Sequence, residues 1–186
     1  MPGRTVVVRS SGPSVHHHQG QGVTCCCGCV RCCACINWGY LVSRPGIMKI
    51  AEFILASMCQ SLSIRFGLPY ATDMGSAFEG FLAACSACLI GSFCLLVCFV
   101  VSEKSVGLVR SSLFETIHNG VCAALVLSSS SSLMAAVNLY LWPRYLITPF
   151  YQVFPAMTAA AFLGVILGIL FAFDCYLSYR YYKGYR

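Results

Sequence analysis

Seven cysteines stand within eleven residues near the start of the chain, the densest group of reactive side chains in the sequence. They precede the first long apolar stretch by about a dozen residues, and juxtamembrane cysteines on the cytosolic side are good sites for S-palmitoylation. Each acyl chain would tie the tail to the bilayer at ~0.8 kcal/mol per buried methylene. We therefore expect lipid attachment at this segment. The candidates are Cys25, Cys26, Cys27, Cys29, Cys32, Cys33 and Cys35.

Metal binding is the second interpretation of this segment. Successive C-x-x-C pairs are formed by Cys26, Cys29, Cys32 and Cys35, with histidines upstream at 16–18. Zinc takes such ligands, but its structural sites usually separate two C-x-x-C pairs by a longer loop. An iron–sulfur run has similar spacing, but its usual last spacing and proline are missing. Unmodified thiols are the third interpretation. We expect no metal and no other cofactor.

A second group of chemically active side chains falls inside apolar stretches, where a charge is costly unless it is paired. We expect these side chains to form a polar cluster on the cytosolic side that links the first, third and fourth stretches. A proton or ion relay is the functional alternative. A smaller pair between Arg65 and Glu79, with Asp73 as competitor, is expected toward the outer side. The residues of the main cluster are Lys49, Glu52, Glu115, His118 and Asp174.

Catalysis is not expected from these residues. His118 is the only histidine within the apolar stretches, and no ordered nucleophile, base and acid or set of metal ligands accompanies it in the sequence. We therefore predict that the chain is not an enzyme.

Four long apolar stretches must position both groups. The composition is 58% hydrophobic and only 10% charged, which excludes an ordinary soluble domain. Each stretch can cross a hydrocarbon core ~30 Å thick, so we predict an all-α, four-transmembrane-helix bundle. The net charge of +6 does not indicate nucleic-acid binding, because the basic residues flank the stretches. The stretches are Ile47–Pro69, Ala77–Val101, Leu113–Leu141 and Val153–Tyr179.

The distribution of basic residues predicts the orientation. Arginines without acids precede the first stretch, and basic residues also fill the middle gap and the end of the chain. The positive-inside rule then places both termini in the cytosol. The outer loops are expected at Gly67–Ser76 and Trp142–Gln152, the latter lying on the bilayer surface as an interfacial belt, or serving as a contact for a partner or an opposed membrane. We divide the chain into a cytosolic cysteine-rich tail (1–43), a four-span membrane domain (44–180) and a short basic tail (181–186).

Small and hydroxylated residues indicate how the spans pack. A four-residue repeat in the fourth stretch favours close helix contact, either within the bundle or at a dimer or oligomer face. Its members are Ala156, Ala160, Gly164, Gly168 and Ala172. The five serines 128–132 in the third stretch can each bond a carbonyl one turn back. Because they face all sides of a helix, we expect that helix to be well enclosed, with a polar pore lining as the alternative.

The two ends of the apolar region resemble a known family. Arg44-Pro-Gly-Ile-Met-Lys-Ile-Ala-Glu-Phe-Ile-Leu-Ala resembles the start of a MARVEL domain, and Phe173-Asp-Cys-Tyr-Leu-Ser-Tyr-Arg resembles its close. The resemblance covers about Arg44–Arg180 and is similar to the branch with plasmolipin, the myelin-and-lymphocyte proteins and the chemokine-like-factor group. A small insect MARVEL protein linked to myoblast fusion is a candidate relative.

The resemblance implies a non-enzymatic role. Members of the family organise membrane patches in vesicle trafficking, membrane apposition or fusion, so it implies a multi-pass protein of the plasma membrane, transport vesicles or both. The implied partners are the lipid bilayer, in cholesterol-rich patches, and further copies of the chain or other membrane proteins. No catalytic residues are carried over from the family. A small channel or transporter and a cell-junction component remain the alternative functions.

Overall fold

The computed structural model describes residues 37–148 and 152–184, without the side chains of Glu103, Lys104 and Ser111. All of these residues belong to one unit of the chain, Cys35–Arg186. The candidate lipidation cysteines at 25–35 lie outside the described residues, as does the segment 149–151.

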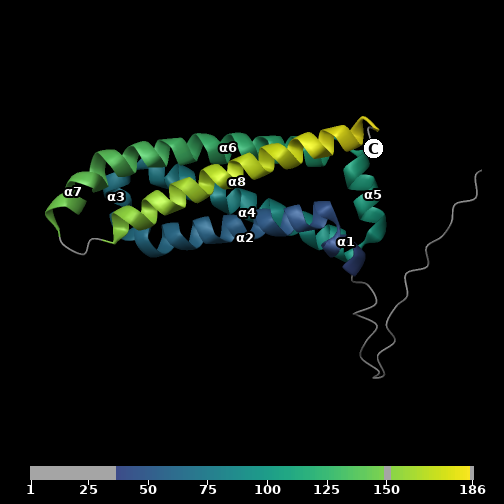
Figure 1. Cartoon of the computed structure of the whole chain (residues 1–186), viewed down its shortest axis with the longest axis horizontal. Helices are drawn as coiled ribbons and strands as arrows, with labels where there is room; N and C mark the ends of the chain where they lie inside the picture. Colours follow the sequence, from purple (N-terminus) through teal and green to yellow (C-terminus); the bar gives the residue numbers. More distant parts are fainter. Residues whose placement is uncertain (1–36, 149–151, 185–186) are drawn as a thin grey trace, which may run out of the picture. The chain divides into compact units, whose positions relative to one another are not determined.

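Four long helices run side by side in this unit (Figure 1). They are α2 (Arg44–Leu62), α4 (Ser76–Val101), α6 (Phe114–Ala136) and α8 (Val153–Tyr182). Helices α2 and α6 each pack against both α4 and α8, and the described residues contain no strand. The four helical stretches that are long and apolar enough to cross a membrane match the four predicted spans in order. The predicted all-α four-span fold is thus confirmed, whereas the side of the membrane on which the termini lie remains a prediction.

Two of the spans continue beyond their predicted ends. Helix α2 is followed without a loop by a π-helical turn, η2 (Ser63–Gly67), a 3-10 turn, η3 (Leu68–Tyr70), and the short helix α3 (Ala71–Met74). Helix α6 is likewise followed by a π-helical turn, η4 (Val137–Leu141), and by α7 (Trp142–Ile147). Both segments that we expected to be outer loops are therefore helical over much of their length.

Prolines explain the shape of these extensions. Pro69 and Pro143 each stand in the first turn of the short helix that follows a π-helical turn. Proline lacks an amide hydrogen, and its ring clashes with the carbonyl four residues earlier in a regular α-helix. The wider turn before each proline shifts the hydrogen-bond ladder, so the helix continues past the proline instead of ending there.

Two short helices close the opposite end of the bundle, at the start of α2. Helix α1 (Trp38–Val42) contacts α4, and α5 (Glu103–Ser111) contacts α4, α6 and α8. The amide of Asn37 donates to the carbonyl of Val100 at 2.9 Å, and the ring of Tyr40 lies 5.1 Å from that of Phe99. The gap between the second and third spans is thus the helix α5, which has Ser102 as its N-cap and packs against α4, α6 and α8.

The serine run faces outward more than we predicted. Only Ser130 is buried, while Ser128, Ser131 and Ser132 are not covered by protein. Hydroxyls of the run donate to carbonyls three or four residues earlier, such as Ser132 to Ser128 at 3.0 Å. The expectation of a well-enclosed helix is wrong, because hydroxyls that are satisfied by their own helix do not require a protein neighbour.

Candidate functional site

Charged residues occupy positions on the core-facing stripe of α2. The buried residues of this helix recur every three or four positions, which is the spacing of one helix face. Two of them, Lys49 and Glu52, have side chains that are 0% exposed. The periodicity that buries the apolar residues of α2 therefore also carries these two charges into the bundle. The full stripe is Gly46, Lys49, Glu52, Ala56 and Cys59.

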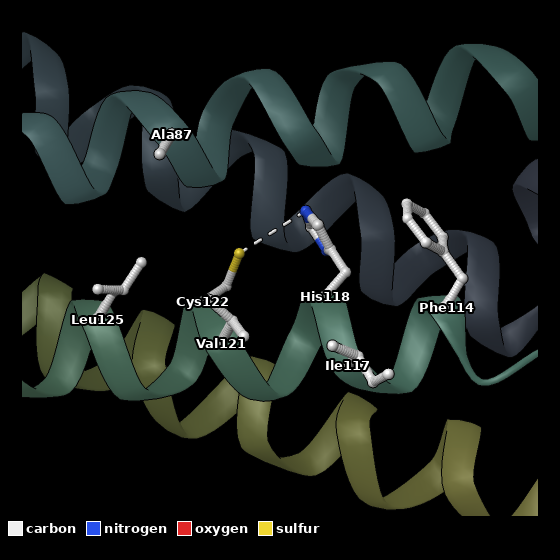
Figure 2. Close-up of a pocket in the computed structure, with 7 residues that line it drawn as sticks. All are labelled: Ala87, Phe114, Ile117, His118, Val121, Cys122 and Leu125. Atoms are coloured by element: carbon white, nitrogen blue, oxygen red, sulfur yellow. Dashed lines mark hydrogen bonds between the residues drawn. The ribbon is translucent and has the colours of Figure 1, made fainter.

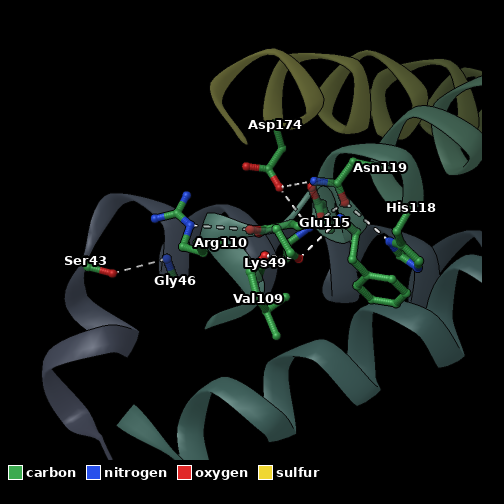
Figure 3. A network of polar contacts seen from close by, with 12 residues as sticks. Ser43, Gly46, Lys49, Val109, Arg110, Glu115, His118, Asn119 and Asp174 are labelled. Carbon is green, nitrogen blue, oxygen red and sulfur yellow. Dashed lines mark hydrogen bonds and ion pairs between the residues drawn. The ribbon is translucent and has the colours of Figure 1, made fainter. Parts of the chain in front are cut away.

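Lys49 is the centre of a polar cluster that joins three helices. Its Nζ lies 2.9 Å from Glu52 Oε2 and 2.8 Å from Asp174 Oδ2, and it donates to Asn119 Oδ1 at 2.7 Å. An ammonium group has three protons to donate, so each finds an oxygen. Figure 3 shows the side chains of Lys49, Asn119 and Asp174 converging from α2, α6 and α8. We refer to Lys49, Glu52, Asn119 and Asp174 as the Lys49 cluster.

Asn119 holds a defined orientation within the Lys49 cluster. Its Nδ2 donates to Asp174 Oδ2 at 2.7 Å, while its Oδ1 accepts from Lys49. Lysine can only donate, and an ionised carboxylate can only accept. The two ends of the amide are therefore assigned by their partners, and Asn119 links α6 to α2 and α8 through complementary contacts.

Glu115 lies beside the Lys49 cluster and is paired from another direction. Its side chain is 1% exposed, and its Oε2 lies 3.4 Å from the Nε of Arg110 on α5. The guanidinium group of Arg110 also lies 5.1 Å from the ring centre of Tyr181. Arg110 thus connects the short helix α5 to both α6 and α8 at this end of the bundle.

Tyr40 brings a neutral polar group from α1 to the same region. Burial, and after it the nearby carboxylate of Glu115, raise the pKa of the Tyr40 hydroxyl above its ordinary value. The phenol therefore stays protonated at physiological pH. It adds no further negative charge to a region that already holds three carboxylates, those of Glu52, Glu115 and Asp174.

The structure brings the five predicted cluster residues to one end of the bundle, but not into one set of contacts. Lys49, Glu52 and Asp174 pair directly, whereas Glu115 pairs with Arg110. His118 lies at the edge, with Nδ1 3.4 Å from the Oδ1 of Asn119. A relay function for these groups remains a prediction.

Sequence reasoning missed Asn119, Arg110 and the neighbour of His118 on its own helix, Cys122. Asn119 stands four residues after Glu115 and Cys122 four residues after His118, spacings that place each pair on one helix face. This signal was available from the sequence. Arg110 gave no comparable signal, because its contacts depend on how α5 folds across the end of the bundle.

The small-residue repeat of α8 enters the bundle only in its middle. Ala160, Gly164 and Gly168 are buried, whereas Ala156 is partly covered and Ala172 is exposed. A Cβ at Gly164 would overlap the Oγ of Ser130 on α6. Four-residue steps advance ~40° beyond a full turn of a 3.6-residue helix, so the repeat drifts away from the core-facing stripe.

The other end of the bundle has a different character. Arg144 Nη1 lies 2.6 Å from Asp73 Oδ2, with side chains that are 54% and 36% exposed. Asp73 therefore pairs with Arg144, and among the described residues no ion pair joins Arg65 to Glu79. The Arg65–Glu79 pair that we expected is not formed; Asp73, the expected competitor, pairs with Arg144 of α7 instead. Rings of Trp142, Tyr145 and Phe154 pack together nearby.

Comparisons with known proteins agree with this architecture. Residues 40–177 match the MARVEL family, described as a membrane-associating domain. The chain is 43% identical over 162 residues to the protein singles bar of Drosophila melanogaster, an alignment that covers 87% of this chain and 90% of the relative. No solved structure shows a significant match. With its four spanning helices, the chain is an integral membrane protein that belongs to the MARVEL family.

Proposed function

We propose that the chain is a non-enzymatic organiser of membrane patches that acts in vesicle trafficking, membrane apposition or fusion. The observation that carries this proposal is the inside-out distribution of polarity. The charged side chains of Lys49 and Asp174 are at most 1% exposed, whereas apolar side chains such as Ile90 and Ile169 are about 60% exposed (63% and 59%). An apolar surface around a charged core fits a protein that works within the bilayer.

The small size of the parts outside the bundle supports the same proposal. The connecting helices α3, α7 and α5 have only 4, 6 and 9 residues. This leaves little chain among the described residues for a separate binding or catalytic domain. Helix α8, with 30 residues, is ~45 Å long at ~1.5 Å per residue. This length is enough to cross a plasma membrane, whose hydrocarbon core is ~32–33 Å thick.

The finer proposal is a role in cell–cell fusion, including the fusion of myoblasts, at the plasma membrane or on transport vesicles. It rests on the family and on the 43% identity to the insect protein singles bar. Homo-oligomers or other membrane proteins would be its partners, and no nucleic acid is involved.

The proposed role in cell–cell fusion can be tested by asking whether this chain can take the place of singles bar. The chain would be expressed in Drosophila cells that lack singles bar, next to a Lys49→Met variant as a folding-impaired control. We expect the intact chain to restore cell–cell fusion when its level in the membrane equals that of the relative. The Lys49→Met variant should not restore it. A failure of the intact chain at equal membrane levels would contradict a shared role.

Lipid attachment at the cysteine-rich tail is part of the proposal. The hydrogen bond from Asn37 to Val100 ties the chain to the end of α4, and Cys35 precedes Asn37 by two residues, a reach of at most ~7 Å. The seven candidate cysteines therefore precede, in the sequence, the residue that is bonded to the end of a membrane span. Acyl-exchange labelling of a variant with all seven cysteines 25–35 changed to serine should lose most of its signal. Unchanged labelling would contradict the proposal.

A channel through a single bundle has less support. The core of the described bundle is filled by apolar side chains, including those of Phe81, Leu133 and Phe171, and the outward serines bond their own helix. A pore needs a continuous polar path. Ion flux from vesicles reconstituted with the purified chain should therefore equal that of empty vesicles. Flux above that level would favour the channel over the organiser.

A further inference from the structure

The thiol of Cys122 and the imidazole of His118 lie against each other on α6, one helical turn apart. Their Sγ and Nε2 atoms are 3.7 Å apart. Figure 2 shows both side chains pointing from α6 toward α4, where they line an open crevice of about 340 Å³. The remaining lining residues are all apolar: Ala87, Phe114, Ile117, Val121 and Leu125. The crevice opens on the outer surface of the bundle, which faces lipid in a four-span protein.

A glycine on α4 makes room for the imidazole. A Cβ at Gly91 would overlap the Nε2 of His118 and lie 3.1 Å from its Cε1. The ring is therefore packed against the backbone of α4 at this position. Because the ring is held on one side by Gly91 and at its Nδ1 by Asn119, its Nε2 stays directed at the thiol.

The Lys49 cluster determines which nitrogen of His118 carries the proton. The Oδ1 of Asn119 must be an acceptor, because Lys49 donates to it and the amide Nδ2 donates to Asp174. The Nδ1 of His118, 3.4 Å from this Oδ1, must then be the donor. In a neutral imidazole this leaves Nε2 as an acceptor, and Cys122 S–H is the donor that faces it.

We propose that Cys122 is a modification site for lipid-derived α,β-unsaturated aldehydes, with His118 as its general base. The sulfur forms a bond to the β-carbon of the aldehyde while the carbon–carbon π bond breaks. The thiol proton passes to His118 Nε2 and from there to the α-carbon. The product is a thioether that keeps its aldehyde group, and the step consumes no oxidant or reductant.

The shape and lining of the crevice favour this class of electrophile. A medium-chain alkenal dissolves in hydrocarbon and has no bulky head group, so it can enter from the bilayer between α4 and α6. The nucleotide-bearing carrier of an acyl thioester is charged and does not suit an apolar crevice of about 340 Å³. A general base of this kind accelerates proton transfer by ~10²–10⁴-fold, which sets the scale of the expected effect.

The chain contains its own comparison thiols. Cys94 and Cys98 on α4 are exposed on the outside of the bundle, so both meet the same lipid as the crevice. His118 is the only histidine among the described residues, and neither of these cysteines has a hydrogen bond to it. If exposure alone decided reactivity, Cys94 and Cys98 would react faster than the buried Cys122.

The test uses the full chain in lipid nanodiscs and a 2-alkenal of medium chain length with a terminal alkyne. Site-resolved mass spectrometry would follow the rate of thioether formation at each cysteine. We expect Cys122 to react at least ~10-fold faster than Cys94 and Cys98, a conservative fraction of general-base acceleration. In His118→Gln, which keeps a polar side chain but no base, the Cys122 rate should fall ~10-fold or more, with the other two rates unchanged.

Three results would overturn the proposal. They are equal or faster reaction at Cys94 and Cys98 in the unaltered chain, an unchanged Cys122 rate in His118→Gln, and preferential labelling of Cys122 by an alkyne fatty acyl thioester. The first comparison uses only the unaltered chain, so it decides the question even if the variant does not fold. Circular dichroism of the variant in the same nanodiscs shows whether it folds.

Discussion

Both ends of the bundle hold ion pairs between neighbouring helices, but in opposite settings. Lys49 and Asp174 lie 2.8 Å apart with side chains 0% and 1% exposed, while Arg144 and Asp73 lie 2.6 Å apart with side chains 54% and 36% exposed. The distances are nearly equal. The distance within an ion pair therefore does not indicate how much it contributes to stability. Burial is what determines the cost of losing one partner.

The two settings have different energetic consequences. Removing one partner of a buried pair leaves an uncompensated charge in a medium of low dielectric constant, which costs ~3–5 kcal/mol. An exposed pair contributes only ~0–1 kcal/mol. At the Lys49 end, an ammonium group from α2 and an amide from α6 both donate to the carboxylate of Asp174 on α8, so the contacts depend on one another. At the Asp73 end, stability must come from close packing of helices.

The largest effect is expected for Asp174→Asn. This change removes one of the two carboxylates that pair with Lys49 and places an amide where Asn119 donates. Because it breaks a buried ion pair, the free energy of unfolding should fall by ~3–5 kcal/mol. Unfolding by SDS in mixed micelles, followed by circular dichroism, measures it. A loss below ~1 kcal/mol would mean that the buried pair behaves like an exposed one.

A second variant separates the effect of an unbalanced charge from the effect of altered packing. The triple variant Lys49→Met, Glu52→Gln, Asp174→Asn removes all three charges of the Lys49 cluster and keeps side chains of similar size. It should be more stable than Asp174→Asn alone, because it leaves no charge in the core that has lost one of its partners.

The second effect concerns the packed half of the bundle. Gly164→Val should lower the free energy of unfolding by ~1–3 kcal/mol, because its side chain would overlap Ser130 and Phe81. Gly80→Ala is the matched control, since a Cβ there meets nothing within 4 Å. It should leave stability unchanged or raise it by up to ~1 kcal/mol through helix propensity. Equal effects of the two changes in the same SDS titration would refute the assignment of close packing to this half.

The third effect is small. Arg144→Ala removes the exposed partner of Asp73, and we expect a loss of ~0–1 kcal/mol that shrinks as salt is added. Thermal unfolding at low and high salt measures it. A loss as large as that of Asp174→Asn would erase the contrast between the two ends.

The smallest effect is expected for Ser130→Ala. The hydroxyl of Ser130 is buried against Gly164 and has no hydrogen-bond partner among the described residues. Its removal should change the free energy of unfolding by less than ~1 kcal/mol and can raise it, because a buried unsatisfied hydroxyl is itself unfavourable. A loss of 2 kcal/mol or more, roughly twice a typical hydrogen bond, would instead indicate a partner that Ser130 holds in the membrane.

The fold was predictable because a membrane imposes a simple rule on the sequence. Backbone polar groups in hydrocarbon must be satisfied within the segment, so four long apolar stretches imply four helices. The paired charges were also predictable in kind, since Lys49 and Asp174 fall inside apolar stretches where an unpaired charge is too costly. The extension of two spans past Pro69 and Pro143 was not, because a π-helical turn before a proline leaves no mark in hydropathy.

The sequence by itself thus determined the number and order of the spans and the family to which the chain belongs. Only the tertiary structure determined which side chains contact one another across helices. It set Gly164 against Ser130, brought Asn119 between Lys49 and Asp174, and set His118 against Gly91. The physical reason is that spacing along a helix determines which residues share a face. The rotation of each helix relative to its neighbours determines which residues that face contacts.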